Sequence, residues 1–201
     1  MLPERSLAFA GIRLLLLVVA CAAMPARADE SAEVGQLLRA GKLGEAMTRA
    51  DAYLSTKPND PQMRFIKGVI QRSSGNQEDA IATFTKLTED YPELPEPYNN
   101  LAVLYAGQGQ FDKARVALEM AVRNNPGYAT AQENLGDVYA KLASQAYGKA
   151  LQLDSGNTSI APKLALLREL FSAINKGQPT GMAPAATAPA PVASGASAVS
   201  R

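Results

Sequence analysis

The 201-residue sequence carries 20 lysine and arginine residues against 19 aspartate and glutamate residues, and it contains no histidine and one cysteine. Without histidine the chain cannot form a Ser-His-Asp or Cys-His catalytic arrangement, and it lacks the commonest general base. A formal net charge of +1 without a basic cluster argues against nucleic-acid binding, so we expect neither an enzyme nor a nucleic-acid-binding protein.

Residues 1–28 have the pattern of a secretory signal peptide. Arg5 and Arg13 make the start basic, residues 14–23 form an apolar core of ten residues, and residues 26–28 form an A-x-A cleavage site. Ten apolar residues are too few to span a bilayer as a helix, and no later segment comes close to that length. We therefore expect an exported, periplasmic chain with no transmembrane segment after processing.

The same segment contains a second processing signal. The run Val-Val-Ala-Cys that ends at Cys21 resembles a lipobox, where bacterial lipoproteins are cleaved and lipid-modified. Lipidation of Cys21 would make the protein an outer-membrane lipoprotein, whereas cleavage after Ala28 would remove this only cysteine; an uncleaved anchor is a third alternative. Both cleavage alternatives imply a bacterial envelope protein without a free thiol or disulfide. With no histidine either, we expect no metal or other cofactor.

Small and helix-breaking residues recur in this chain at a spacing of 34. A 34-residue period with helical patterning between the breaks indicates a solenoid of helix pairs, each unit consisting of a helix A, a turn and a helix B. Such a stack exposes an extended groove, so the period favours binding over catalysis. The four tracks in phase are Gly41, Gly75 and Gly109; Ala46, Ala80 and Ala114; Pro58, Pro92 and Pro126; and Gly68, Ala102 and Gly136.

Residues 95–128 show the unit most completely. Large side chains at helical spacing form one face of helix A, small residues let the two helices approach, a glycine permits the tight turn, and a proline ends the unit. These residues are Tyr98, Leu101, Ala102, Tyr105, Gly109, Phe111, Ala114, Leu118, Ala121 and Pro126. The pattern resembles the tetratricopeptide repeat, and the resemblance covers roughly residues 29–176.

The resemblance implies an all-α solenoid of antiparallel helix pairs, with three full-length units, a shortened fourth and a C-terminal capping helix. The first unit spans about residues 28–60 and the second spans residues 61–94. The second departs from the family at Lys67 and Gln71, where large apolar residues are usual. A substitute stripe, displaced by one position, predicts that its helix A is rotated slightly: Met63, Ile66 and Ile70.

The fourth unit is five residues short. Residues typical of the end of helix B arrive early, and residues 130–147 contain no proline and no glycine other than Gly136. We predict that residues 130–153 form one long helix, or two helices joined by a very tight kink. Residues 159–176 then read as an amphipathic capping helix with Pro162 in its first turn. From residue 177 the chain is rich in Ala, Pro, Ser and Gly, and we expect a disordered tail.

In the family, the inner surface of helix A faces a concave groove that holds a partner peptide. Carried over by repeat position, the resemblance implies a groove with an apolar end and an acidic end, suited to a segment with an apolar anchor near a lysine or arginine. The groove residues are Phe65, Val69, Arg72, Asn99, Val103, Ala106, Glu133, Asp137 and Lys141. The carboxylate clamp of chaperone-docking members is not expected, because Asn100 matches it but its cationic positions hold Phe65, Thr130 and Asn134.

The sequence therefore predicts three segments: a signal peptide (residues 1–28), a solenoid domain (29–176) and a tail (177–201). The leading interpretation is a non-enzymatic scaffold of the bacterial cell envelope that binds a peptide segment of a partner protein. The alternative is a lipid-anchored factor, attached through Cys21, that assists assembly of outer-membrane, pilus or secretion machinery. Envelope tetratricopeptide proteins that coordinate cell division are a third alternative, although those carry a coiled-coil segment that is absent from this sequence.

Overall fold

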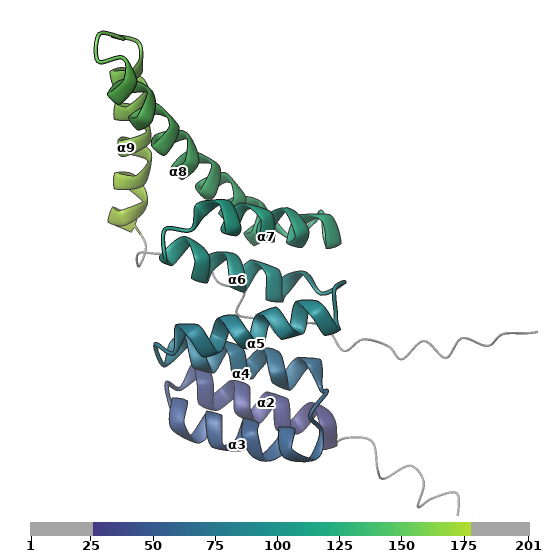
Figure 1. The fold of residues 1–201 in the computed structure, drawn as a ribbon. Helices are drawn as coiled ribbons and strands as arrows, with labels where there is room; N and C mark the ends of the chain where they lie inside the picture. Colours follow the sequence, from purple (N-terminus) through teal and green to yellow (C-terminus); the bar gives the residue numbers. More distant parts are fainter. Residues whose placement is uncertain (1–25, 178–201) are drawn as a thin grey trace, which may run out of the picture.

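The computed structural model describes residues 26–177, and within them it contains eight helices and no strand. Seven successive elements stack from one end of the molecule to the other, and the last folds back along its neighbour (Figure 1). The helices are α2 (Ala26–Arg39), α3 (Leu43–Thr56), α4 (Pro61–Ser73), α5 (Gln77–Asp90), α6 (Pro95–Gly107), α7 (Phe111–Asn124), α8 (Ala129–Leu153) and α9 (Ile160–Gly177). The all-α solenoid of helix pairs is confirmed. Most of the predicted signal peptide, with Cys21, and the tail from residue 178 lie outside the described residues.

The glycine track closes every A–B turn in the same way. Gly41, Gly75 and Gly109 have φ values of 73°, 80° and 71°, the left-handed region that glycine adopts without steric cost. In the third unit the amide of Gly109 donates to the carbonyl of Ala106 (3.0 Å), and the next amide donates to Tyr105 (2.9 Å). This pair of bonds is a Schellman motif, and both other turns repeat it. The turn therefore ends helix A and reverses the chain within three residues.

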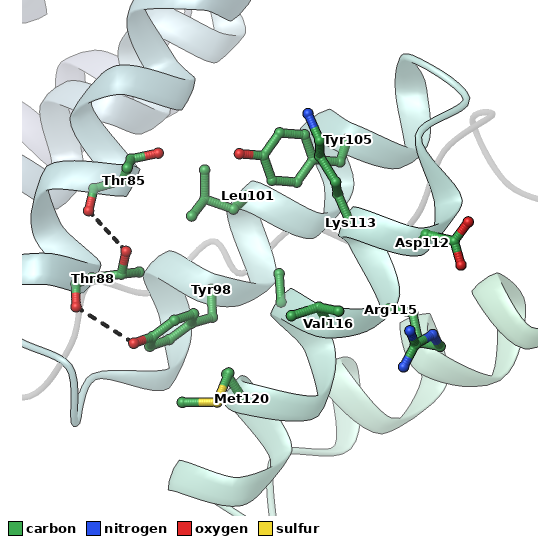
Figure 2. A pocket seen from close by; sticks show the side chains of 11 residues that line it. Thr85, Thr88, Tyr98, Leu101, Tyr105, Asp112, Lys113, Arg115, Val116 and Met120 are labelled. Carbon is green, nitrogen blue, oxygen red and sulfur yellow. Dashed lines mark hydrogen bonds between the residues drawn. The ribbon is translucent and has the colours of Figure 1, made fainter.

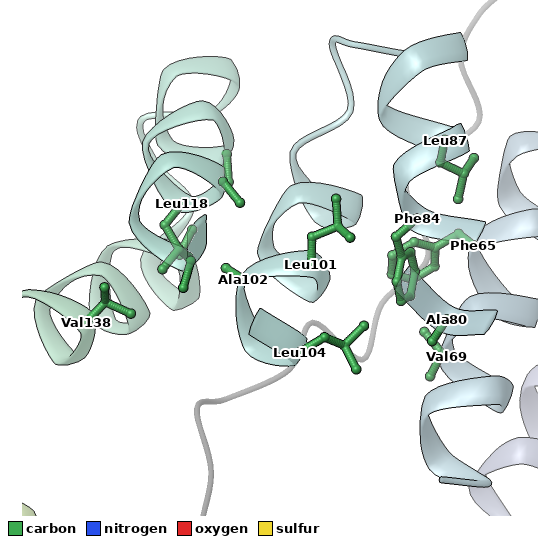
Figure 3. Packing of buried hydrophobic residues seen from close by; sticks show 14 residues of the cluster. Phe65, Val69, Ala80, Phe84, Leu87, Leu101, Ala102, Leu104, Leu118 and Val138 are labelled. Atoms are coloured by element: carbon green, nitrogen blue, oxygen red, sulfur yellow. The ribbon is translucent and has the colours of Figure 1, made fainter. Parts of the chain in front are cut away.

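Small residues set the distance between the paired helices. A Cβ atom on Gly68 of α4 would lie 2.7 Å from the ring of Phe84 on α5, so only glycine admits that ring without a shift. Phe84 is fully buried and its ring centroid lies 5.6 Å from that of Phe65. Ala102 and Ala114 have the corresponding role between α6 and α7, where both are fully buried. Figure 3 shows Ala102 on the side of its helix that faces Leu118.

The buried side chains form two clusters that meet at α4. One cluster joins α2, α3 and one side of α4, where Met63, Ile66 and Ile70 are buried, as the substitute stripe predicted. The other extends from the opposite side of α4 through α5, α6 and α7 to Val138 on α8. Helix α4 is therefore apolar on two sides, because it packs between two neighbours.

The fourth unit contains a single uninterrupted helix of 25 residues, α8. This outcome is the first of the two predicted alternatives. Without a turn glycine the backbone has no site at which to reverse, so the helix continues past the point where helix B would begin. The predicted capping helix is α9, which packs against α8 and begins one residue later than expected.

Substitution of Gly68 should show how tightly α4 and α5 approach. We expect Gly68→Ala to lower the free energy of unfolding by about 1–3 kcal/mol, because the new methyl group overlaps the buried ring of Phe84. The matched control is Gly148→Ala in α8, where an added Cβ would meet no atom within 4 Å. The control should be neutral or should stabilise by up to about 1 kcal/mol through helix propensity. Urea titration followed by circular dichroism measures both, and equal effects at the two sites would contradict this packing.

Candidate functional site

The structure places the predicted groove residues in three different environments. Phe65 and Val69, the expected apolar end, are buried, with 1% and 6% of their surfaces exposed. Asn99 is fully buried, Glu133 is exposed, and the remaining positions are half-buried. The half-buried positions are Arg72, Val103, Ala106, Asp137 and Lys141.

The apolar end of the groove differs from the expectation for a clear reason. Repeat position gives the side of helix A on which a residue lies, but it does not say how closely the neighbouring helices cover that side. At Phe65 the neighbouring Phe84 from α5 seals the side chain inside the second cluster, together with Val69. Both side chains therefore belong to the core, and a partner could contact neither without opening it.

The middle of the concave side is a ladder of polar side chains that links successive A helices. The guanidinium of Arg72 on α4 donates to Oδ1 of Asn100 on α6 (2.9 Å), and the amide of Asn100 donates to the Glu96 carbonyl (3.0 Å). One step further, Nδ2 of Asn134 on α8 donates to Oδ1 of the buried Asn99 (2.8 Å). These bonds fix the stacking of α4, α6 and α8. Asn99 and Arg72, at positions predicted to contact a bound peptide, therefore form hydrogen bonds with other helices of the same chain.

The acidic end of the groove holds carboxylates close to each other. Partial burial raises the pKa of the Asp137 carboxyl, the negative charge of Glu133 raises it further, and Lys141 opposes the shift. The ammonium group of Lys141 lies 3.7 Å from the ring centroid of Phe171 on α9, a cation–π contact. A cationic group from a partner would relieve the repulsion between the two carboxylates, so this end keeps the preference predicted for it.

A pocket lies on the side of the stack opposite the predicted groove. Its volume is about 460 Å3, and it opens between the two B helices α5 and α7, with α6 as its floor (Figure 2). Aromatic and aliphatic side chains form the floor and one wall, and charged side chains of α7 form the rim. The lining residues are Thr85, Thr88, Tyr98, Leu101, Tyr105, Asp112, Lys113, Arg115, Val116, Ala117 and Met120.

Hydrogen bonds fix the shape of this pocket. The Tyr98 hydroxyl donates to the Thr88 carbonyl (3.4 Å), and the Thr88 hydroxyl donates to the Thr85 carbonyl (2.8 Å). Both bonds fall along one edge of the pocket (Figure 2). Val116 stands at the opposite edge and leaves 52% of its surface in solvent. A pocket with apolar walls and mixed charges at its rim is suited to one apolar side chain of a partner segment.

Sequence reasoning missed this pocket, although one signal for it was present. The helical spacing predicts that Tyr98, Leu101 and Tyr105 share one face of helix A, and all three do contact the core. The pocket appears because α5 and α7 leave part of that face uncovered. The available signal was Val116, an apolar residue outside the buried alanine and leucine stripe of α7.

Within the described residues, no helix is long and apolar enough to cross a membrane, and no group of three or more acidic, histidine or cysteine side chains could hold a metal ion. The fold and its two exposed sides define a class: a short helix-hairpin solenoid that offers surfaces for binding other proteins. Two tetratricopeptide repeat models match the sequence, over residues 36–95 and 71–142. The chain belongs to the tetratricopeptide repeat family, whose members mediate protein–protein interaction.

Relatives and solved structures agree with this assignment. A chloroplast tetratricopeptide repeat protein of Arabidopsis thaliana is 31% identical over 133 residues, which cover 64% of this chain and 38% of that protein. A tetratricopeptide protein of Thermus thermophilus has a similar fold, with a TM-score of 0.54 and 24% identity over 74% of this chain and 84% of that one. The Yersinia enterocolitica secretion chaperone SycD, solved with a peptide of the translocator YopD, gives a TM-score of 0.50 and 16% identity, over 63% of this chain and 92% of that one.

The chain spans much less than two thirds of the length of two curated relatives that it matches, 38% of the Arabidopsis protein and 27% of a probable biofilm formation methyltransferase of Pseudomonas putida. The match therefore concerns a repeat region within larger proteins. What those whole proteins do is a separate question from what this region binds.

Substitution of Phe65 should separate a core role from a binding role. We expect Phe65→Ala to lower the free energy of unfolding by about 3–5 kcal/mol, because it removes a fully buried ring that packs against Phe84. Val103→Ala, on the half-buried concave side of α6, is the control and should cost about 1 kcal/mol or less. Chemical denaturation of both variants measures the difference. A small loss of unfolding free energy for Phe65→Ala would contradict its role in the core and would favour its predicted role in the groove.

Proposed function

We propose that this protein is an exported, non-enzymatic scaffold of the bacterial cell envelope that holds a segment of a partner protein. Its family membership supports the scaffold, and the signal pattern of residues 1–28 supports the location. The observation that carries the binding mode is the pocket between α5, α6 and α7, because buried apolar anchors supply most of the affinity in such contacts. The expected partner is a protein segment with an apolar side chain between charged residues.

The rim of the pocket supports a preference for charged flanking residues. Asp112, Lys113 and Arg115 place both signs of charge at its edge, on one helix. Arg115 is held by Glu119 (2.8 Å), whereas Lys113 lies 5.4 Å from the ring centroid of Tyr105. Charges at a rim mainly set orientation and the salt dependence of binding, so the apolar anchor decides affinity.

The concave groove is the second surface on which the partner could bind. Its acidic end favours a lysine or arginine, but its apolar end is closed by the burial of Phe65 and Val69. The two surfaces lie on opposite sides of the A helices, so single substitutions can tell them apart.

Two matched valine substitutions test which surface binds. The partner is first identified by crosslinking and pull-down from the native envelope, with the untagged protein as control. Val116→Asp places a charge in the pocket, and Val103→Asp places the same charge on the concave side. We expect the first to weaken binding by a factor of about 10–100, the range for losing an apolar anchor, and the second to leave affinity nearly unchanged. Titration calorimetry measures both, after circular dichroism has shown that each variant keeps its helices.

The reverse order of effects would assign binding to the concave groove. If neither valine matters while the fold survives, the proposed binding mode is wrong.

The intact mass of the protein purified from its native envelope decides between the two export routes. We expect the mass of a chain that begins at Asp29, because residues 26–28 form an A-x-A cleavage site. A mass that includes an N-terminal Cys21 carrying acyl chains would support the alternative, a lipid-anchored assembly factor of outer-membrane, pilus or secretion machinery. Growth with labelled palmitate, with Cys21→Ser as the control, confirms either result.

A further inference from the structure

The C-terminal helix pair, α8 and α9, carries most of the exposed large hydrophobic residues in the part of the chain that the structure describes. Among the residues whose side chains the structure describes, five large hydrophobic residues are exposed, and four of them lie on α8 and α9. Tyr139 and Leu153 on α8 expose 48% and 77% of their surfaces, and Leu166 and Leu170 on α9 expose 67% and 47%. The family fold explains why this surface exists.

Helix α8 contains a helix A joined in line to a helix B. When five residues are omitted after Ala140, the chain from Lys141 onward matches α7 in register. The four residues of α7 that are buried against α6 are Ala114, Ala117, Leu118 and Ala121. Their counterparts in α8 are Ala143, Ala146, Tyr147 and Ala150, of which Ala146 is exposed and the others are only half-buried. The second half of α8 therefore keeps the core face of a helix B but has no helix A against it.

The first half of α8 has the face of a helix A but has no helix B packed against it. Gly136 occupies the repeat position of Gly68, which the ring of Phe84 approaches so closely that no Cβ would fit. A Cβ on Gly136 would meet no atom within 4 Å, and Gly136 is exposed. The position at which a helix B packs onto α8 is thus formed but uncovered.

Both halves present these residues on one side of α8. Gly136, Tyr139, Ala143, Ala146 and Ala150 follow each other at intervals of three or four, which places them in one stripe along the helix. We name these five residues the α8 stripe. The stripe is distinct from the side that packs on the core, which carries Asn134 and Val138, and from the side that α9 covers near Lys141.

We propose that the α8 stripe binds the α8 stripe of a second copy of this chain, in an antiparallel, twofold-symmetric dimer. A straight helix cannot fold its second half back onto its first half, and a second copy of the chain carries the helix B that matches the uncovered position. In the antiparallel arrangement each copy covers the first half of the other with its own second half, and the contact closes on itself. The pairs of α4 with α5 and α6 with α7 are the same contact within one chain.

The repeat also sets the register of this dimer. Gly68 receives Phe84, and the counterparts of these two residues in the fourth unit are Gly136 and Tyr147. Gly136 of one copy therefore lies against the partner's Tyr147, and the twofold axis passes between residues 141 and 142. The large ring fills the space at the glycine, as it does inside the second unit.

Helix α9 extends the contact. The ammonium of Lys163 lies 5.3 Å from the ring centroid of Tyr147. Tyr147 follows Ala143 by four residues and precedes Ala150 by three, so it adjoins the α8 stripe, and this side of α9 borders the stripe. Leu166 and Leu170 follow Lys163 by three and seven residues and share that side. Stable dimers bury about 1,200–2,000 Å2 in total, and these exposed leucines add apolar area to the helix pair.

The first experiment restores the missing turn. The full chain in a Cys21→Ser background is expected to have the mass of two chains by size exclusion with light scattering. A variant with a second copy of Gly107–Phe111 inserted after Ala140 regains the turn, so its helix B can fold back within the chain, and we expect a monomer. The control carries the same five residues after Gly156, in the loop between α8 and α9, and should remain a dimer.

The second experiment tests the register without altering the backbone. Chains carrying Gly136→Cys are mixed with chains carrying Ala146→Cys, both in the Cys21→Ser background, and oxidised. We expect a disulfide between the two kinds of chain, and none when Val116→Cys replaces Gly136→Cys. A monomeric parent chain at its highest soluble concentration, a dimer that survives the turn insertion, or no specific disulfide would each overturn the proposal. If the insertion variant loses its helices by circular dichroism, the disulfide experiment alone decides.

Discussion

The close approach of a helix B to its helix A is the contact on which this structure depends. Gly68 admits the ring of Phe84 because it has no Cβ, and the small side chains of Ala102 and Ala114 are fully buried between α6 and α7. Close approach brings the aromatic and aliphatic side chains of both helices into one buried cluster. A single pair could not bury both of its faces, so each unit needs the next, and the stack grows by repetition.

The close contact between helix A and helix B depends on the turn that joins them. The chain can reverse within three residues only where glycine adopts positive φ, and it does so after α2, α4 and α6. Where the turn is missing, the close contact is lost with it, although Gly136 is still present. Helix α8 therefore shows that a small residue in helix A is not sufficient: the partner helix must be returned to it by the turn.

Much of this fold could be predicted because its determinants are local. Positive φ at Gly109, the helix break at Pro126 and the uninterrupted pattern of α8 are each properties of a few adjacent residues. The binding surfaces were harder to predict, since they depend on how far neighbouring helices cover a given side. Repeat position placed Phe65 on the inner side of α4, but only packing against Phe84 shows that the side is sealed.

The pocket between α5, α6 and α7 shows the same limit of prediction from sequence, because here residues that look buried are partly exposed. Tyr98 and Tyr105 look like core residues from their spacing, and both are partly buried and packed against the core. The pocket above them exists because Thr85 on α5 and Val116 on α7 do not meet across the gap. No pattern within one helix encodes the width of a gap between two others.

Helix α7 lines the pocket between α5, α6 and α7, and it also contacts the α8 stripe. Arg115, at the pocket rim, holds Glu119 at 2.8 Å, and Glu119 accepts a hydrogen bond from the hydroxyl of Tyr139 in the stripe (3.1 Å). The hydrogen bond to Arg115 lowers the pKa of the Glu119 carboxyl, and the bond to Glu119 raises the pKa of Tyr139. At neutral pH the Glu119 carboxylate therefore stays charged beside Arg115, while the neutral Tyr139 hydroxyl keeps the proton that it donates to Glu119. In the proposed dimer Tyr139 is covered by the second copy. Each dimer would then carry two pockets beside a common interface, and a partner with two segments could bind both with greater avidity than either pocket alone provides.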